Sequence, residues 1–230
     1  MPVVAFASPK GGVGKTTAAV LLASEFADKG AGVTIIDADP RRRIQRWADK
    51  AAIPGKLTIR SEISETNIID EIEQAVSETP FVIVDLEGSA SVMVSYAISR
   101  ADLVLIPAQG SQMDAEEAVD AIRLVQRQEK AFKRTIPYAV LLTKTSAAIR
   151  PRTLRHIVKE LDAAGIPRLS VELFERDAFK ALFSFGGTLT DLDRSQVSGI
   201  KDAAVNAKAF AAEVIERLRV KGEPVKAEVA

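Results

Sequence analysis

A glycine- and lysine-rich segment near the amino terminus, SPKGGVGKTT, has the residue types and spacing of a phosphate-binding loop. Its three glycines can bring the backbone close to phosphate groups and can adopt positive φ angles. Successive backbone N–H groups and the start of a helix then form a cradle for anions. Lys15 is placed to contact the β- and γ-phosphates of a nucleotide, and the Thr16 hydroxyl to bind Mg²⁺. The residues predicted to bind ATP or ADP are Lys10, Gly11, Gly12, Val13, Gly14, Lys15, Thr16 and Thr17.

This segment departs from the pattern GxxxxGK[ST] at its beginning. Pro9 stands where the first glycine is expected, and Lys10 adds a positive charge that the ordinary loop does not require. Because the missing N–H of Pro9 falls outside the cradle, the proline stiffens the loop entry at little cost. The alternative is a glycine-rich turn with an incidental lysine, but a strand before the loop and a helix after it favour a nucleotide site.

Two apolar runs end in carboxylates. VTIIDADP ends with Asp37 and Asp39, and FVIVDLEG supplies Asp85. Apolar residues followed by an aspartate at a strand end are typical of a carboxylate that holds Mg²⁺ directly or through water. Each aspartate alone could instead cap the next helix. Three of them beside a phosphate loop favour a magnesium–nucleotide site.

The elements that must position these residues alternate along the chain. The apolar runs are continuous, as in strands buried on both faces of a parallel sheet. We expect strands at 3–8, 33–37, 81–85, 103–107, 138–143 and 169–173, and helices at 16–29, 114–130, 151–164 and 201–220. This alternation predicts an α/β fold with one doubly wound, mostly parallel sheet flanked by helices, and ligands at the carboxyl ends of its strands.

Composition limits the other possibilities. Lys plus Arg (31) balance Asp plus Glu (31), so any basic site must be local. The chain has no cysteine, which excludes disulfides and thiolate metal sites. It has neither a signal-peptide pattern nor an apolar run near the roughly 20 residues of a membrane span, so we expect a cytoplasmic protein. We expect one ATPase domain over 1–220 and a flexible tail over 221–230.

The segment KGGVGKTT resembles the deviant Walker A motif of the ParA/MinD ATPases, in which the first glycine is replaced and a signature lysine is added. The resemblance extends to 37–40, 81–85, 105–118 and 175–193, and so covers nearly the whole chain. It implies a P-loop NTPase that forms a homodimer with two ATP molecules between its subunits. It also implies that Lys10 crosses to the phosphates of the other subunit, in the manner of an arginine finger.

The same resemblance implies roles for individual residues. The catalytic residues would be Lys10, Lys15 and Asp39, with Asp39 orienting or polarising the attacking water. Thr16, Asp37 and Asp85 would hold Mg²⁺ and its waters. Residues 105–114 resemble the loop beside the nucleotide and the dimer interface, and Thr143 and Lys144 stand where the family contacts the adenine side. The run RRR at 41–43 and the LEGS after Asp85 depart from the family pattern, which affects partner details more than ATP binding.

The relatives within the group differ in features that can be compared with this chain. Relatives of nitrogenase iron protein need cluster cysteines, and larger ParA proteins carry an amino-terminal helix-turn-helix domain before the first strand. MinD-like members end in a basic amphipathic helix that lies on membrane. Here the last helix is alanine-rich with mixed charges, so we expect it to pack on the core and predict no membrane partner. The sequence favours a short ParA-type partition ATPase.

Four basic residues are candidates for DNA binding: Arg150, Arg152, Arg155 and Lys159. The last three share one face of the helix expected at 151–164, where cations at its start oppose the helix dipole and suggest phosphate contact. The alternative is a solvated face paired with Glu160 and Asp162.

The function predicted from the sequence is an ATP-dependent dimerising switch that partitions or positions plasmid or chromosomal DNA or other cargo. It would bind nonspecific DNA on the nucleoid, and a ParB-like or small centromere-binding adaptor would stimulate its slow hydrolysis of ATP. A MinD-like positioning ATPase on membrane and a small-molecule P-loop metabolic enzyme remain the alternatives.

Overall fold

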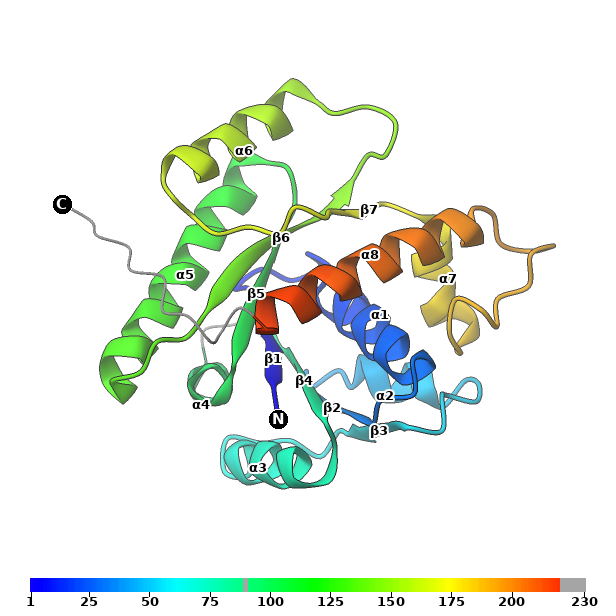
Figure 1. Cartoon of the computed structure of the whole chain (residues 1–230), viewed down its shortest axis with the longest axis horizontal. Coiled ribbons are helices and arrows are strands. Elements are labelled where there is room, and N and C mark those ends of the chain that lie inside the picture. Colours follow the sequence, from blue (N-terminus) through cyan, green and yellow to red (C-terminus); the bar gives the residue numbers. More distant parts are fainter. Residues whose placement is uncertain (89–90, 220–230) are drawn as a thin grey trace.

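A seven-stranded sheet with the strand order β3-β2-β4-β1-β5-β6-β7 forms the centre of the protein (Figure 1). The structure is a computed structural model that describes residues 1–88 and 91–219. All strand pairs of this sheet are parallel, so the predicted doubly wound α/β fold is confirmed. The strands are β1 (Val3–Phe6), β2 (Val33–Ala38), β3 (Leu57–Arg60), β4 (Phe81–Leu86), β5 (Leu103–Ala108), β6 (Tyr138–Thr145) and β7 (Leu173–Phe174).

Helices cover both faces of the sheet, which is why its strands are apolar on both sides. Along β1, Val4 and Phe6 point into one core and Val3 and Ala5 into the other. One face carries α1 (Lys15–Asp28), α2 (Arg43–Ala48), α7 (Asp177–Phe185) and α8 (Ile200–Arg219). The opposite face carries α3 (Ile68–Glu78), α4 (Val92–Arg100), α5 (Gln112–Phe132) and α6 (Arg152–Ala163).

The strand order explains where a ligand can bind. From β1 the chain runs to β2 and β3 on one side, returns to β4, and then crosses to β5 on the other side of β1. The carboxyl end of β1 therefore lies where the winding direction reverses, which is the position of ligand sites in open α/β sheets. The predicted phosphate loop leaves the sheet at this point.

The structure corrects one predicted strand. Residues 169–173 were expected to be extended, but β7 contains only Leu173–Phe174. Just before it, the Glu213 carboxylate of α8 accepts hydrogen bonds from the N–H groups of Ser170 and Val171 (2.7 and 2.8 Å), so these groups are not available to a strand ladder. The short, partly exposed edge strand β3 was not predicted at all.

The last helix packs on the core as expected. Phe210 and Val214 of α8 are fully buried, and Ile215 and Leu218 pack against the same core. The predicted tail at 221–230 lies outside the described residues. Within the described part of the chain, no helix combines the length and apolar character needed to cross a membrane.

Candidate nucleotide site

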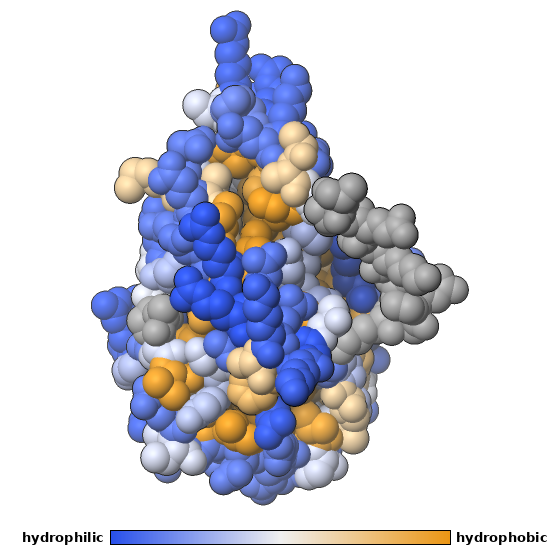
Figure 2. Space-filling model, turned by 90° about the vertical axis from the view of Figure 1, so that its left-hand side faces the viewer, coloured by the Kyte–Doolittle hydropathy of each residue, from blue (hydrophilic) through white to orange (hydrophobic). Residues whose placement is uncertain are grey.

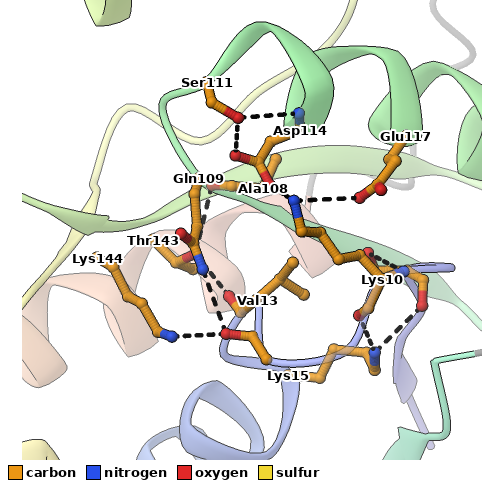
Figure 3. A network of polar contacts seen from close by, with 12 residues as sticks. Lys10, Val13, Lys15, Ala108, Gln109, Ser111, Asp114, Glu117, Thr143 and Lys144 are labelled. Carbon is orange, nitrogen blue, oxygen red and sulfur yellow. Dashed lines mark hydrogen bonds and ion pairs between the residues drawn. The ribbon is translucent and has the colours of Figure 1, made fainter.

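The loop between β1 and α1 has the form of an anion cradle. Gly12 and Gly14 adopt positive φ angles of 78° and 97°, which side chains with a Cβ rarely adopt. The Lys15 side chain folds over the loop, and its Nζ donates hydrogen bonds to the carbonyl oxygens of Ser8 (3.1 Å) and Lys10 (2.9 Å) (Figure 3). Burial lowers the pKa of Lys15, while Asp85 and Asp39 raise it. Among the described residues this ammonium donates hydrogen bonds to loop carbonyls alone, so phosphate oxygens can replace them.

Two side chains of β6 and that of Gln109, the residue after β5, donate hydrogen bonds to carbonyl oxygens of the loop (Figure 3). The Thr143 hydroxyl donates to the Val13 carbonyl oxygen (2.7 Å), and Lys144 Nζ donates to the Gly12 carbonyl oxygen (2.6 Å). Gln109 reaches the same Gly12 oxygen at 3.2 Å. Thr143 is only 2% exposed, so its hydroxyl supports the loop in this structure. The adenine contacts expected of Thr143 and Lys144 stay a prediction.

The unusual sequence after Asp85 has a packing explanation. A Cβ placed on Gly88 would lie 3.0 Å from the Gly11 nitrogen and 3.1 Å from the Lys10 carbonyl carbon. These neighbours are backbone atoms of the phosphate loop, so they cannot yield without moving the cradle. The glycine in LEGS therefore permits the close approach of two loops.

Asp37 and Asp85 lie side by side at the carboxyl ends of β2 and β4, as paired residues of the ladder. Both Asp85 oxygens and Asp37 Oδ1 are buried and make no hydrogen bond of normal distance and angle with a described residue, although the Thr16 hydroxyl lies near enough to Asp85 to lower its pKa. Burial raises the pKa of Asp85 to about 7, and the charges of Asp37 and Asp39 act in the same direction, against the opposing effect of Thr16 and Lys15. Buried, unpartnered carboxylate oxygens beside a phosphate loop fit a Mg²⁺ site.

Asp37 also has a structural role. Its Oδ2 accepts hydrogen bonds from the N–H groups of Ile44 (2.9 Å) and Gln45 (3.1 Å), which fixes the start of α2. Burial raises its pKa against these hydrogen bonds. No group of three or more acidic, histidine or cysteine side chains converges within the described residues. A bound Mg²⁺ would therefore take its remaining ligands from phosphates and water.

Asp39 is less buried than the other two aspartates, with 19% of its side chain exposed. Its Oδ1 accepts a hydrogen bond from the Arg41 N–H (2.8 Å), and its Oδ2 lies 3.9 Å from Arg43 Nε. Of the three arginines at 41–43, Arg43 is the one that lines the cavity beside the phosphate loop. The sequence did not distinguish Arg43 from its neighbours, because a run of three identical residues does not show which side chain faces the cavity.

Lys10 points away from the cradle and toward α5 (Figure 3). Its Nζ lies 2.9 Å from Asp114 Oδ1 and 3.9 Å from Glu117 Oε2. Burial raises the pKa of Asp114, but hydrogen bonds from Ser111 and Lys10 outweigh it and lower that pKa. The hydrogen bond to Asp114 raises the pKa of Lys10. Lys10 and Lys15 thus belong to one loop but have separate environments.

Asp114 is a functional candidate that sequence reasoning missed. It is only 4% exposed, and the Ser111 hydroxyl both donates to its carboxylate and accepts from its N–H (3.2 Å). The spacing Ser-x-x-Asp at the start of a helix signals a capping box, and this signal was present in the sequence. The second role, as partner of a lysine 104 positions away, carries no local signal.

A cavity of about 350 Å³ continues from the loop toward α7. Gly14 and Thr17 of the loop segment form one wall, and Arg176 and Phe179 form part of the opposite wall. Arg176 also lies over the Phe174 ring, 5.5 Å from its centroid. The size and mixed apolar and cationic lining suit the base and sugar of a nucleotide.

The structure separates the four DNA candidates. Arg152, Arg155 and Lys159 lie on the exposed face of α6, opposite its buried leucine and isoleucine side chains. Arg150 instead forms an ion pair with Glu172 (2.5 Å). Figure 2 shows the side of the molecule that carries α5 and α6, with strongly hydrophilic side chains over much of it.

The expected partners of the α6 cations are occupied elsewhere. Glu160 lies 3.3 Å from His156, and Asp162 is bonded to Arg168 at 2.8 Å. Arg152, Arg155 and Lys159 make no side-chain ion pair with any residue that the structure describes. These three side chains therefore remain available to contact phosphates.

The fold and the site together define a P-loop nucleotide-binding protein: a glycine-rich loop between β1 and α1, a lysine over the loop, and aspartates at the ends of β2 and β4. The family model for the VirC1 protein matches residues 1–225. The chain belongs to this family of short ParA-type proteins. It is 42% identical over 218 residues to "Protein ParA" of Rhizobium radiobacter, a match that covers 95% of this chain and 98% of that protein.

Solved structures agree on the fold. Apo McdA from Cyanothece is 17% identical, with a TM-score of 0.74, and the match covers 93% of this chain and 99% of that chain. A plasmid partition protein from Borrelia burgdorferi B31 bound to AMPPNP is also 17% identical, with a TM-score of 0.71, and the match covers 94% and 99% of the two chains. At this identity the likeness concerns the fold alone.

Proposed function

We propose that this protein is a switch ATPase that pairs with a second copy of itself when ATP is bound, and that the pair holds DNA without sequence preference. The observation that carries the proposal is the separation of the two lysines of one loop. Lys15 lies over the cradle, whereas Lys10 lies outside it and is held by Asp114. A nucleotide site of one chain needs only the first lysine, so the second is available to another molecule.

The residues of the site divide the chemistry between them. Lys15 and the loop N–H groups bind the phosphates, and Asp39 orients the attacking water. Thr16, Asp37 and Asp85 would hold Mg²⁺, which supplies charge neutralisation on the phosphates when bound. Lys10 of one copy stabilises the negative charge that develops on the phosphates held by the other copy. Similarity to a protein named ParA and to a partition protein solved with AMPPNP supports this division.

In the unpaired protein Lys10 is bonded to Asp114. It leaves this partner only when the triphosphate of a second copy offers a stronger one, so pairing depends on ATP. A switch from 1:99 to 99:1 needs about 5.5 kcal/mol of differential binding free energy. Two contacts between Lys10 and phosphates, one in each direction, replace two ion pairs within the separate copies. ATP carries a negatively charged γ-phosphate that ADP lacks, so hydrolysis and loss of phosphate weaken the pair.

The basic face of α6 is duplicated when two copies pair, which raises affinity for DNA through two simultaneous contacts. A basic face without ion pairs neutralises phosphates of any sequence. We propose that such DNA binding partitions or positions plasmid or chromosomal DNA or other cargo. A ParB-like or small centromere-binding adaptor would stimulate hydrolysis and release the protein.

The test is DNA binding with ATP, with ADP and without nucleotide, measured at several salt concentrations on DNA of unrelated sequences. We expect binding only with ATP, equal affinity for all sequences, and a steep decrease of affinity with salt. Equal binding in all three nucleotide states, or no salt dependence, contradicts the proposal. A parallel measurement with anionic liposomes should show no ATP-dependent binding, because a membrane-positioning protein would bind there instead.

A further inference from the structure

Helices α1, α7 and α8 lie on the same side of the sheet (Figure 1). A second pocket lies between the carboxyl-terminal half of α1, the end of α7 with the loop that follows it, and α8. Its volume is about 510 Å³. Leu21, Leu182 and Leu189 line it and are nearly fully buried. The pocket centres on residues about ten positions after Lys15, which places it roughly 15 Å along α1 from the phosphate loop. It is therefore separate from the nucleotide site.

Two polar side chains in this pocket are buried without partners. Glu25 is 6% exposed, and its carboxylate makes no hydrogen bond or ion pair with any residue in 1–88 and 91–219. The adjacent Ser24 is 7% exposed, and its hydroxyl finds no hydrogen-bond partner among the same residues. Buried carboxylates in proteins are normally paired, because the loss of hydration is costly. A largely buried carboxylate that faces a cavity without a partner suits a ligand that brings its own donor.

Charges of both signs surround the Glu25 carboxylate. Burial raises the pKa of Glu25, and the ammonium of Lys208 opposes this effect without forming an ion pair with it. Asp28 lines the pocket as well, and burial and the charge of Asp191 raise its pKa. Lys29 and Lys208 offset part of this negative charge, but neither contacts the Glu25 carboxylate.

A metal ion does not fit this pocket. A hard cation such as Mg²⁺ or Ca²⁺ prefers a site rich in oxygen ligands that also leaves room for its waters. The pocket places two carboxylates, of Glu25 and Asp28, beside two lysines and between leucine side chains, and no cluster of three or more metal-ligating side chains occurs among the described residues. Leucine walls suit an aliphatic chain that ends in a positive charge.

We infer that this pocket binds an organic cation, namely an ammonium or guanidinium group on an aliphatic stem. The charged group contacts the Glu25 carboxylate, and the stem lies along Leu21, Leu182 and Leu189. A free polyamine and a lysine or arginine side chain of a protein partner share this chemistry. The inference does not depend on ATP or DNA binding.

The experiment uses the full chain without nucleotide, titrated separately with agmatine, spermidine and the peptide acetyl-Ala-Lys-Ala-amide. Amide chemical shifts by NMR report the site, and calorimetry reports the affinity. We expect shifts concentrated at Ser24–Lys29 and Ala204–Lys208, and at least one probe that binds at micromolar to millimolar concentration. Tighter binding of the free amines assigns the site to a metabolite, and tighter binding of the peptide assigns it to a protein partner.

Three variants complete the test. Glu25→Gln should weaken binding at least tenfold, whereas Glu216→Gln, which removes the same charge from an exposed position of α8, should leave it unchanged. Lys208→Met should tighten binding several-fold, because the competing ammonium is removed. No binding of any probe to the wild type or to Lys208→Met, or equal binding to Glu25→Gln and wild type, overturns the inference.

Discussion

The phosphate-loop edge of the sheet and the exposed face of α6 carry positive charge in opposite ways. At the loop every lysine is held: Lys10 by Asp114, Lys15 by loop carbonyls and Lys144 by the Gly12 carbonyl. On α6 the cations make no ion pair with a described residue, although acidic side chains stand beside them.

This difference separates two kinds of phosphate recognition. A nucleotide has one geometry, so a preorganised set of donors binds it with little loss of side-chain freedom. DNA of any sequence presents repeated phosphates, and mobile solvated cations gain affinity there mainly through release of counterions. The loop edge is therefore expected to depend on geometry, and the α6 face on charge and salt.

The largest effect is expected at Lys15. Lys15→Ala removes the ammonium that lies over the cradle and should weaken ATP binding about 100-fold, since charge-assisted contacts to phosphate are strong. Fluorescent-nucleotide titration measures this. Lys144→Ala, which removes a lysine bonded to the same loop from outside, should weaken binding only a few-fold. Equal losses in both variants would show that the loop responds to net charge alone.

A smaller effect is expected from a change of shape without a change of charge. Gly88→Ala places a Cβ 3.0 Å from the Gly11 nitrogen and so displaces the cradle. Hydrolysis of ATP should fall roughly tenfold or more, because small displacements of positioned groups are costly. Gly55→Ala is the matched control, since a Cβ there meets nothing within 4 Å. Normal turnover in Gly88→Ala would show that hydrolysis does not depend on the exact position of the phosphate loop.

On the α6 face the expected change is in salt dependence. Changing Arg152 and Arg155 together to alanine should weaken DNA binding several-fold on every sequence, and lower the slope of log affinity against log salt by about 2. Fluorescence anisotropy at three or more salt concentrations measures this slope. The double change of Lys29 and Lys56 to alanine is the control. It removes the same charge near the carboxyl-terminal end of α1, on the other face of the sheet from α6, and should leave the slope unchanged. A slope that falls equally in both proteins argues against α6 as the contact.

The smallest effect is expected in stability. The lowered pKa of Asp114 means that its charged form favours the folded state, so this contribution is present above the unfolded pKa near 4 and is lost as the pH falls through the lower folded value. Asp114→Asn should lower the Tm by roughly 2–4 °C at pH 7. The difference from wild type should vanish toward pH 2–3. A difference that persists at low pH would assign the effect to helix capping instead.

The sequence predicted the features that are local. The loop, its glycines and the aspartates at the ends of β2 and β4 are each contained in a few consecutive residues, and the structure places them at one edge of the sheet. The apolar strands β1, β2, β4, β5 and β6 and the helices α1, α5, α6 and α8 were predicted for the same reason, whereas α3, α4 and α7 were not predicted. The absence of a Cβ permits the positive φ angles of Gly12 and Gly14, and this property can be recognised from residue type alone.

The features that were missed depend on contacts between distant segments. Asp114 receives Lys10 only because β1 and β5 are neighbours, and Thr143 turns to Val13 because β6 lies beyond β5. The early part of the expected strand at 169–173 does not form, because the N–H groups of Ser170 and Val171 donate to Glu213 of the last helix. Identical arginines at 41–43 could be separated only by the direction of α2. Each of these outcomes follows from tertiary structure that no local pattern encodes.

The state of Lys10 is best tested by sedimentation of Lys10→Gln with ATP, at a protein concentration where the wild type pairs. We predict that Lys10→Gln binds ATP within a few-fold of wild type yet sediments as a monomer, while Asp114→Asn, which frees Lys10, still pairs. A Lys10→Gln protein that forms ATP-dependent dimers as readily as wild type would contradict the role of this lysine between subunits.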